Sequence, residues 1–469
     1  MLDLPRLIIA APYGRCGKTT VALGLGAACA RRGIAVQPFK KGPDYIDPSW
    51  LSAATGRACR NLDLFLMDPQ QVLTALARGA RGADLALVEG AMGLFDGVDV
   101  QGSGSTANVA RLLTAPVLLV LDASRMTRSA AALVQGLQHF EPDVQIAGVI
   151  LNHVAGTRHE TLLTDALRHY CGLPVLGSLP RDAALTIPER HLGLVPRHEN
   201  GTLPPMLAAI RDAVETHVDV DAVLAIARRA APLASSPVEA AALPPSSVRV
   251  AVASDRAFTF YYPENLEALR AAGAEVVWLN TLEDAHLPAA DALYIGGGFP
   301  EIFMDELQAN ASLRHEIRAA IGDGLPVYAE CGGLMYLARH ITWNGRGAEM
   351  VGALPCDVEL TGKPQGHGYV TLQVARENPW FASGTELRGH EFHHSRLTNL
   401  GEVAFAYRVV RGRGVDGARD GLIYKNVLAS YTHLHAGGAP QWAERFAAVA
   451  RQGKFSSANH ANLREYSPA

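Results

Sequence analysis

The sequence of 469 residues lacks the features by which several classes of protein are recognised. It has only six cysteines, and no two of them form a C-x-x-C pair, which argues against a zinc ribbon and against a redox dithiol. A disulfide framework is also unexpected, because such frameworks belong to short, cysteine-dense chains. No apolar run approaches the roughly 20 residues that a membrane-spanning helix needs. We therefore expect no structural disulfides, no zinc ribbon and no membrane association.

An excess of charge of either sign is also missing. The 42 Lys and Arg residues against 46 Asp and Glu residues give a net charge of −4, which offers no basis for binding nucleic acid or an anionic membrane. The first residues show no basic stretch followed by an apolar signal core, so we expect a cytoplasmic protein. With 48% apolar and 19% charged residues, the composition is that of a globular protein of two or three domains.

Short apolar runs alternate with helix-length segments along the chain. Strands separated by helices predict an α/β fold with parallel sheets. The Ala-, Pro- and Ser-rich segment 231–247 is predicted to be a linker between domains at 1–230 and 248–452. The polar segment 453–469 is predicted to be a loosely ordered tail.

A glycine turn between an apolar strand and a helical segment is the first candidate site. It reads APYGRCGKTT, with Gly14 and Gly17 ahead of Lys18 and Thr19, which is the context of a phosphate-binding loop. Backbone N–H groups at the helix start would hold the phosphates of ATP, Lys18 would reach the β- and γ-phosphates, and Thr19 would hold Mg²⁺. Pro12 replaces the usual first glycine, and the alternative is a glycine-rich turn with an exposed lysine.

Three acidic residues follow predicted strands near this loop. Asp44 and Asp47 lie in FKKGPDYIDPSW beside Lys40, between two prolines that restrict the loop, and Glu89 ends the apolar run LALVE. The carboxyl ends of strands in open α/β sheets face the ligand crevice, so these acids are candidates for a metal or a reacting carboxylate. A plain polar turn remains the alternative for the first two.

A cysteine on a sharp turn is the second candidate site. Cys331 ends an apolar strand and precedes two glycines in YAECGGLMYL, an arrangement similar to a nucleophile elbow. A helix start should favour its thiolate. His433 or His435 could accept the thiol proton, and Gly296–Gly298 could supply an N–H group for an oxyanion. The alternative is a buried core cysteine.

A further cluster of polar residues lies in GHEFHHSR, with His390, Glu391, His393 and His394. No spaced partner cluster supports metal binding there, so we expect a polar loop that faces substrate, with His390 alternatively satisfying a core.

Seven segments together resemble one family, the cobyrinic acid a,c-diamide synthases. They are KKGPDYIDP, VEGAMGLFDG, FTFYYPENLEAL, YIGGGFPE, YAECGGLMYL, GHEFHHS and NVLASYTHLH. The resemblance extends over about residues 6–450 in the same order. It implies an N-terminal P-loop domain similar to dethiobiotin synthetase and a C-terminal class I glutamine amidotransferase domain.

The reaction implied by the resemblance is ATP- and glutamine-dependent amidation of the a and c acetate side chains of a corrinoid-type tetrapyrrole polycarboxylate through an acyl phosphate. It makes Cys331 the glutaminase nucleophile and His433 its activator. At the synthetase site it implies phosphate and Mg²⁺ binding by Lys18 and Thr19, acidic metal- or substrate-binding roles for Asp44, Asp47 and Glu89, and an acyl-phosphate contact for Lys40.

Several alternatives stay open at this point. The acid that class I amidotransferases often carry two residues after the histidine is replaced by His435, so an orienting acid must come from elsewhere. The acceptor could be cobyrinic or hydrogenobyrinic acid, siroheme or nickel-sirohydrochlorin. A cobyric acid synthase is a second amidotransferase interpretation, and a P-loop ATPase switch without amidotransferase activity is an alternative of another class. We also allow for a homodimer.

Overall fold

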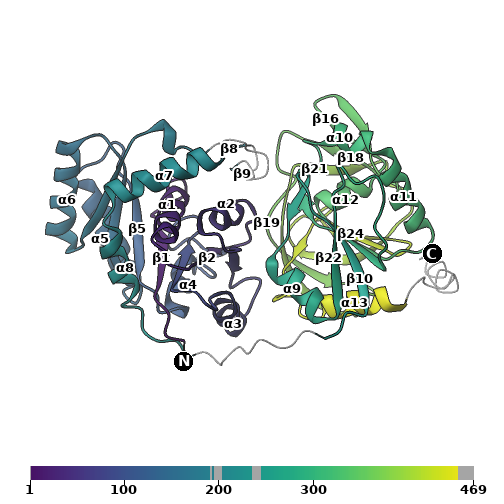
Figure 1. Ribbon diagram of the computed structural model, residues 1–469, viewed down its shortest axis with the longest axis horizontal. Helices are drawn as coiled ribbons and strands as arrows, with labels where there is room; N and C mark the ends of the chain where they lie inside the picture. The colour runs from purple at the N-terminus through teal and green to yellow at the C-terminus, as the bar shows by residue number, and fades with distance from the viewer. Residues whose placement is uncertain (1, 188, 191–192, 195–202, 235–243, 453–469) are drawn as a thin grey trace. The chain divides into compact units, whose positions relative to one another are not determined.

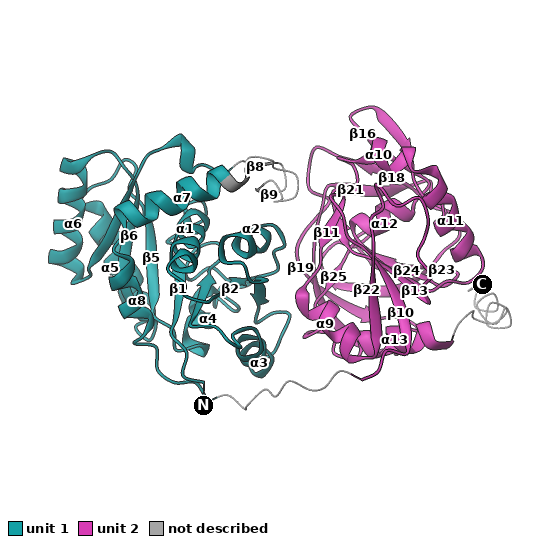
Figure 2. Cartoon of the chain, in the orientation of Figure 1, with its two compact units in different colours: residues 1–240 teal, residues 241–469 magenta. Residues whose placement is uncertain are grey.

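The computed structural model describes residues 2–187, 189–190, 193–194, 203–234 and 244–452 (Figure 1). The chain divides into two compact units, residues 1–240 and 241–469 (Figure 2). The predicted linker falls partly outside the described residues, and the predicted tail lies wholly outside them. The domain limits drawn from the sequence stay predictions.

The first unit is built on one sheet whose seven strands are all parallel. In spatial order they are β3 (Arg60–Leu62), β2 (Val36–Lys41), β4 (Leu85–Glu89), β1 (Arg6–Ala10), β5 (Val117–Asp122), β6 (Ile146–Val154) and β7 (Val175–Pro180). The central strands are buried along their length, which explains their nearly continuous apolar sequences. From β1, the chain first adds strands on one side of the sheet, as far as β3, and later adds β5, β6 and β7 on the other side. The direction of winding therefore reverses beside β1. Ligands bind at the carboxyl ends of strands at such a reversal.

The helices of this unit connect the parallel strands. They are α1 (Lys18–Arg31), α2 (Ile46–Thr55), α3 (Pro69–Gly79), α4 (Thr106–Leu112), α5 (Ser129–Phe140), α6 (Thr157–Cys171), α7 (Leu203–His217) and α8 (Val220–Ala227). A short 3₁₀ turn (Ala183–Leu185) and the hairpin strands β8 (Glu189–Arg190) and β9 (Gly193–Leu194) precede α7. Small residues let α1 pack closely, because a Cβ at Gly24 would lie 2.3 Å from Val214 Cγ2 of α7.

The second unit contains a ten-stranded mixed sheet. In spatial order its strands are β12 (Ala274–Leu279), β10 (Val248–Ala253), β13 (Ala292–Ile295), β15 (Val327–Glu330), β24 (Val427–Ser430), β23 (Arg419–Tyr424), β22 (Ala404–Arg411), β19 (Gly366–Val374), β20 (Glu386–His393) and β25 (His433–Leu434). The first five are parallel to one another, and the pairs from β24 to β25 are antiparallel.

This sheet curls back on itself. Five steps separate β24 from β25 in the sheet, which would be about 24 Å if it were flat. Only Tyr431 and Thr432 connect the two strands along the chain, and three residues span at most about 10 Å. The far edge of the sheet therefore returns to the carboxyl end of β24, next to the end of β15.

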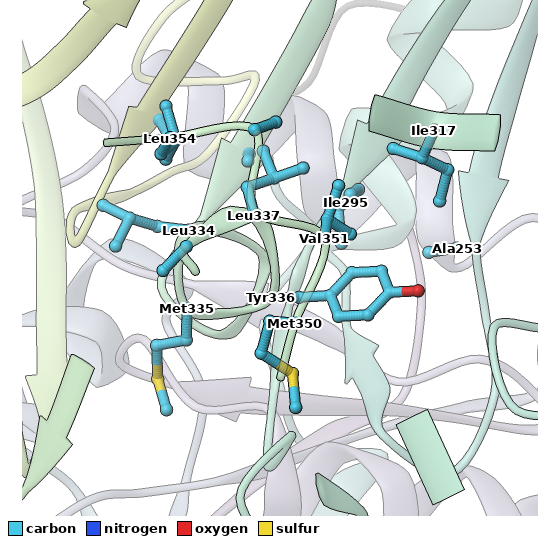
Figure 3. Packing of buried hydrophobic residues seen from close by; sticks show 14 of the residues in the cluster. Ala253, Ile295, Ile317, Leu334, Met335, Tyr336, Leu337, Met350, Val351 and Leu354 are labelled. Carbon is cyan, nitrogen blue, oxygen red and sulfur yellow. The ribbon is translucent and has the colours of Figure 1, made fainter. Parts of the chain in front are cut away.

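The remaining elements of the second unit surround this sheet. They are the paired strands β11 (Phe258–Phe260) and β14 (Gly297–Gly298), the small sheet of β16 (His340–Trp343), β17 (Arg346–Glu349), β18 (Asp357–Leu360) and β21 (Ser395–Thr398), and the helices α9 (Pro263–Ala271), α10 (Met304–Ala309), α11 (Ala311–Gly322), α12 (Gly332–Leu337) and α13 (Trp442–Gln452). Figure 3 shows the side chains of α12 packed with Ile295, Val351 and Leu354 in the core of this unit.

Candidate functional site

The glycine turn after β1 is fixed by a residue of β6. Gly17 has a φ of +95°, and a Cβ there would lie 2.1 Å from Asn152 Nδ2. The same amide donates a hydrogen bond to Cys16 O at 2.9 Å. Asn152 is a residue that sequence reasoning missed, although its position at the end of the apolar run IAGVILN marks it as facing the ligand crevice.

The start of the turn packs against the segment that follows β4. Leu94 N–H donates to Ala11 O at 2.8 Å, and a Cβ at Gly93 would lie 2.5 Å from Pro12 O. Pro12 therefore stands where the turn meets this segment. A Cβ placed at Gly14 would have no heavy atom of the described residues within 4 Å, apart from its chain neighbours. The turn is therefore open at Gly14.

Lys18 bridges the turn and the segment after β4. Its Nζ donates to Met92 O at 2.7 Å and to Tyr13 O at 3.4 Å. Burial, and then the charge of Lys40, lowers the pKa of the Lys18 ammonium. A partly desolvated cation at a helix start is a strong site for phosphate oxygens.

Lys40 and Glu89 occupy neighbouring strand ends. Lys40 pairs with Glu89 in the register of β2 and β4, and Lys40 Nζ lies 3.1 Å from Glu89 Oε1. The same Glu89 oxygen accepts a hydrogen bond from Thr19 Oγ1 at 2.6 Å. Burial raises the pKa of the Glu89 carboxyl, against the opposing charge of Lys40. This geometry places the phosphate turn, Lys40 and Glu89 at one edge of the sheet.

The two aspartates of the proline-bounded loop face the same lysine. Lys40 Nζ lies 2.5 Å from Asp47 Oδ2 and 3.9 Å from Asp44 Oδ2. Asp44 Oδ1 also accepts the N–H group of Ile46 at the start of α2. Burial alone would lower the pKa of Lys40, but Asp47, Glu89 and Asp44 outweigh it and raise that pKa. The structure thus brings together all the acids that the sequence singled out in this half.

Cys331 lies on a strained turn between β15 and α12. Its φ is +47° and its ψ is −100°, which is uncommon for a residue other than glycine. Its N–H group donates to Ser430 O of β24 at 2.7 Å. A Cβ at Gly332 would lie 2.9 Å from Gly298 N, and one at Gly333 would lie 2.3 Å from Ile295 O. The glycine pair is therefore required by the close approach of the chain at 295–298.

The expectation that the helix start favours the Cys331 thiolate is wrong for this structure. The thiol is only 6% exposed, and burial, followed by the charge of Glu301, raises its pKa. The N–H group of Gly332 acts in the opposite direction but is outweighed. The structure thus favours the neutral thiol, and a nucleophilic role for Cys331 would require a base.

The two histidines after β24 have different surroundings. His433 lies in β25 with its ring against the glycine segment, because a Cβ at Gly297 would lie 2.5 Å from His433 Cε1. His435 lies beyond the end of β25, where its Nε2 is 3.5 Å from Glu264 Oε2 of α9. Spacing alone did not separate the two, but the structure places His433 beside the segment that packs on Gly332 and His435 beside Glu264.

The acidic neighbour of His433 comes from an unexpected place. His433 Nδ1 lies 3.4 Å from Oε2 of Glu330, the residue directly before Cys331. Sequence reasoning missed Glu330, since the usual position for such an acid is two residues after the histidine. Only the return of the sheet edge brings the two together.

The GHEFHHSR segment is not a polar loop, so that expectation is wrong. His390 and His393 belong to β20 and are buried, and the ring of His393 stacks on Tyr431 with 3.7 Å between centroids. Glu391 accepts the N–H groups of Arg413 and Gly414. Within the described residues, no three His, Cys, Asp or Glu side chains are arranged to hold a metal ion.

Comparison with known proteins matches each unit to a family. Residues 7–195 match the CobQ/CobB/MinD/ParA nucleotide binding domain, and residues 249–441 match the CobB/CobQ-like glutamine amidotransferase domain. The protein is thus a glutamine-dependent amidotransferase joined to a P-loop nucleotide-binding domain, which confirms the predicted fold class. The interpretation as a P-loop switch without an amidotransferase part is wrong.

Relatives along nearly the whole chain are cobyrinate a,c-diamide synthases. The one from Magnetococcus marinus is 49% identical over 97% of this chain and 99% of its own length. Those from Methanosarcina acetivorans and Archaeoglobus fulgidus are each 43% identical, over 92% and 97% of this chain and 93% and 99% of their own lengths. The chain belongs to the cobyrinate a,c-diamide synthase family, as its sequence motifs indicated. No described helix has the length and apolarity to cross a membrane.

Proposed function

We propose that this chain transfers the amide nitrogen of glutamine to the a and c acetate carboxylates of cobyrinic acid or hydrogenobyrinic acid, in a reaction driven by ATP. The observation that carries the proposal is the 49% identity to the Magnetococcus marinus cobyrinate a,c-diamide synthase over nearly the full length of both chains. The two sites supply the chemistry that such a reaction needs.

The glutaminase half of the reaction uses Cys331 and His433. His433 accepts the thiol proton, and the thiolate attacks the amide carbon of glutamine. N–H groups of Gly298 and Gly332 face the developing oxyanion. The proton on His433 passes to the departing nitrogen, and ammonia leaves. Water then hydrolyses the thioester and releases glutamate.

The synthetase half of the reaction uses the edge of the first sheet. Gly14, Gly17 and Lys18 hold the phosphates of ATP. An acetate oxygen of the acceptor attacks the γ-phosphorus, the bond from this phosphorus to the β,γ-bridging oxygen breaks, and ADP leaves. Lys40 stabilises the negative charge of the acyl phosphate, and Asp44 and Asp47 position the acceptor. Ammonia attacks the acyl carbon and inorganic phosphate leaves.

The residues at this edge fit a magnesium ion. Glu89 Oε2 is buried without a hydrogen-bond partner among the described residues, and the Thr19 hydroxyl lies beside the other oxygen of the same carboxylate. Mg²⁺ in nucleotide sites takes one or two protein oxygens together with phosphate oxygens and water. Thr19, Glu89 and Asp44 would hold the ion, which neutralises phosphate charge when bound.

Mass spectrometry of products tests the proposal. The purified chain is incubated with ATP, Mg²⁺, glutamine and, in parallel, cobyrinic acid, hydrogenobyrinic acid, siroheme or nickel-sirohydrochlorin. We expect the two corrinoid-type acids to gain two amides. If only siroheme or nickel-sirohydrochlorin is amidated, the proposed acceptor is wrong. If no acid is amidated, the proposed function is wrong.

Localisation and assembly belong to the same proposal. We expect a cytoplasmic enzyme that forms a homodimer. Light scattering on the eluate of a size-exclusion column measures the mass of the particle and contradicts the second expectation if it returns that of one chain.

A further inference from the structure

We propose that Glu330 is the positioning acid of the glutaminase site: it orients His433 through Nδ1 and stabilises the imidazolium that forms when His433 takes the thiol proton of Cys331. This inference rests on the proposed glutaminase function. It fills the place that His435 leaves open, since the residue two positions after His433 carries no carboxylate.

The position of the Glu330 carboxylate is fixed from several sides. Its Oε1 accepts hydrogen bonds from Leu434 N–H and from Tyr328 O–H, both at 3.1 Å. The Tyr294 hydroxyl lies 3.4 Å from Oε2, the oxygen that faces His433. The side chain is 1% exposed, so water does not screen it. A carboxylate with this many donors is held in one orientation and remains a good acceptor.

The orientation of the His433 ring follows from its two edges. Nδ1 faces Glu330 at 3.4 Å, while Cε1 and Nε2 face Gly297, at 2.5 and 3.3 Å from a Cβ placed there. Gly298, the next residue, packs on Gly332 beside the nucleophile. An imidazole that keeps its proton on Nδ1, the nitrogen nearest Glu330, leaves the Nε2 lone pair free to accept the thiol proton.

The transfer of a proton from Cys331 to His433 explains why an anion is needed beside His433. The S–H bond of Cys331 breaks, and an N–H bond forms at His433 Nε2, which leaves a thiolate and an imidazolium in a buried site. Burial disfavours both charges. A second anion behind the imidazolium offsets part of that cost, as the aspartate of a Ser-His-Asp triad does.

Other titratable groups surround this pair, and Glu330 is the carboxylate that lies 3.4 Å from His433 Nδ1. His390 stacks on His433 with 4.9 Å between centroids, and burial, followed by His433 and His435, holds its pKa well below the ordinary value. Burial and then the charge of Glu301 raise the pKa of the Cys331 thiol, and Glu330 and Asp420 act in the same direction. Other titratable groups around Cys331 and His433 are Tyr294, Tyr328 and His390.

A matched control exists in the same unit. Glu264 is also buried and lies 3.5 Å from His435, in an arrangement like that of Glu330 with His433. It approaches the other histidine, however, which lies outside β25. A substitution of Glu264 thus removes a buried carboxylate from a Glu–His pair without touching the pair beside the nucleophile.

The experiment compares Glu330→Gln with Glu264→Gln in the full chain. We expect Glu330→Gln to lower the kcat of glutamine hydrolysis about 10²- to 10⁴-fold with little change in KM, because the loss falls on the transition state. Amidation with free ammonia should stay within about twofold in both variants. Glu264→Gln should keep glutamine hydrolysis within about threefold.

The outcomes are separable. Wild-type protein without glutaminase activity would overturn the proposed function itself. Active wild type with unchanged hydrolysis in Glu330→Gln, or an equal loss in Glu264→Gln, would overturn the role of Glu330. If Glu330→Gln also loses ammonia-dependent synthesis, the Glu330→Asp variant distinguishes the proposed role from a structural one. Its side chain keeps the negative charge but is shorter by one methylene, so the carboxylate lies farther from His433. A kcat that recovers toward the wild-type value at unchanged KM supports the role, whereas loss of both activities overturns it.

Discussion

At the scale of single residues, the proposed synthetase site is a buried cluster of charges around Lys40. Lys40 is 5% exposed and faces Asp47, Glu89 and Asp44 at 2.5, 3.1 and 3.9 Å. A buried ammonium is tolerated only when anions compensate it. Three carboxylates are more than one ammonium can neutralise. Because the carboxylates repel one another, the site is suited to bind a cation or a protonated acid.

Asp44 should make stability depend on pH. Burial, and then the charge of Asp47, raises the pKa of its carboxyl to about 7. Since the unfolded value is near 4, its contribution to the free energy of unfolding is complete below about pH 4 and is lost as the pH rises through about 7. Asp44→Asn should therefore stabilise the first unit at pH 8 by about 1–2 kcal/mol, allowing for a 30% exposed side chain, and much less at pH 5. Thermal unfolding at both pH values measures this.

In the same thermal unfolding experiment, Asp47→Asn should have the opposite effect to Asp44→Asn. It removes the carboxylate closest to the buried Lys40 ammonium, so we expect a loss of about 1–3 kcal/mol at pH 8. Equal shifts in melting temperature for Asp44→Asn and Asp47→Asn would contradict the different roles assigned to the two carboxyl groups.

At the scale of elements, close helix packing in the first unit depends on small residues. Gly24 of α1 lies against Val214 of α7, with 2.3 Å to a Cβ placed at Gly24. Gly24→Ala should destabilise the protein by about 1–3 kcal/mol. Gly136 of α5 has no neighbour within 4 Å among the described residues, so Gly136→Ala should stabilise by about 1 kcal/mol. Urea unfolding compares the two, and a stabilised Gly24→Ala variant would contradict the packing.

The sequence predicted these elements unevenly. Buried parallel strands such as β1, β4 and β15 were readable because their apolar runs are continuous and end in turn residues. The antiparallel strands β19 and β22 were not, because their half-exposed sequences mix polar and apolar residues. The contact of Glu330 with His433 could not be predicted either, since it depends on how far the sheet curls rather than on any local pattern.

At the scale of the whole molecule, each unit contains one of the two proposed sites. The residues that match the nucleotide-binding family and those that match the amidotransferase family do not overlap. The two half-reactions should therefore be separable by single substitutions.

Cys331→Ser should abolish glutamine-dependent synthesis. A serine hydroxyl is a far weaker nucleophile than a thiolate, so we expect a loss of more than about 10³-fold in kcat/KM for glutamine. Synthesis from ammonium chloride should remain near the wild-type rate. Loss of both activities in a folded variant would contradict separate sites.

Lys18→Ala should affect synthesis from either nitrogen donor. Its ammonium is the cation at the start of α1, and its loss removes charge that faces the phosphates, so we expect kcat/KM for ATP to fall at least 10²-fold. The measurement uses ammonia as the nitrogen donor, so that the glutaminase site does not contribute. A wild-type kcat/KM for ATP would contradict the assignment of Lys18 to the nucleotide site.

The short connection of Tyr431 and Thr432 has a consequence for how the second unit folds. It joins strands that are neighbours in sequence but far apart in the sheet. We therefore expect His433, the proposed base, to be placed only after every intervening strand has paired. His433 pairs with His390 of β20 and lies beside Glu330, and contacts between residues so far apart in sequence form slowly. During refolding, recovery of glutamine hydrolysis should coincide with the slowest phase seen by tryptophan fluorescence, and a glutaminase that regains activity ahead of that phase would show that its active centre is assembled locally.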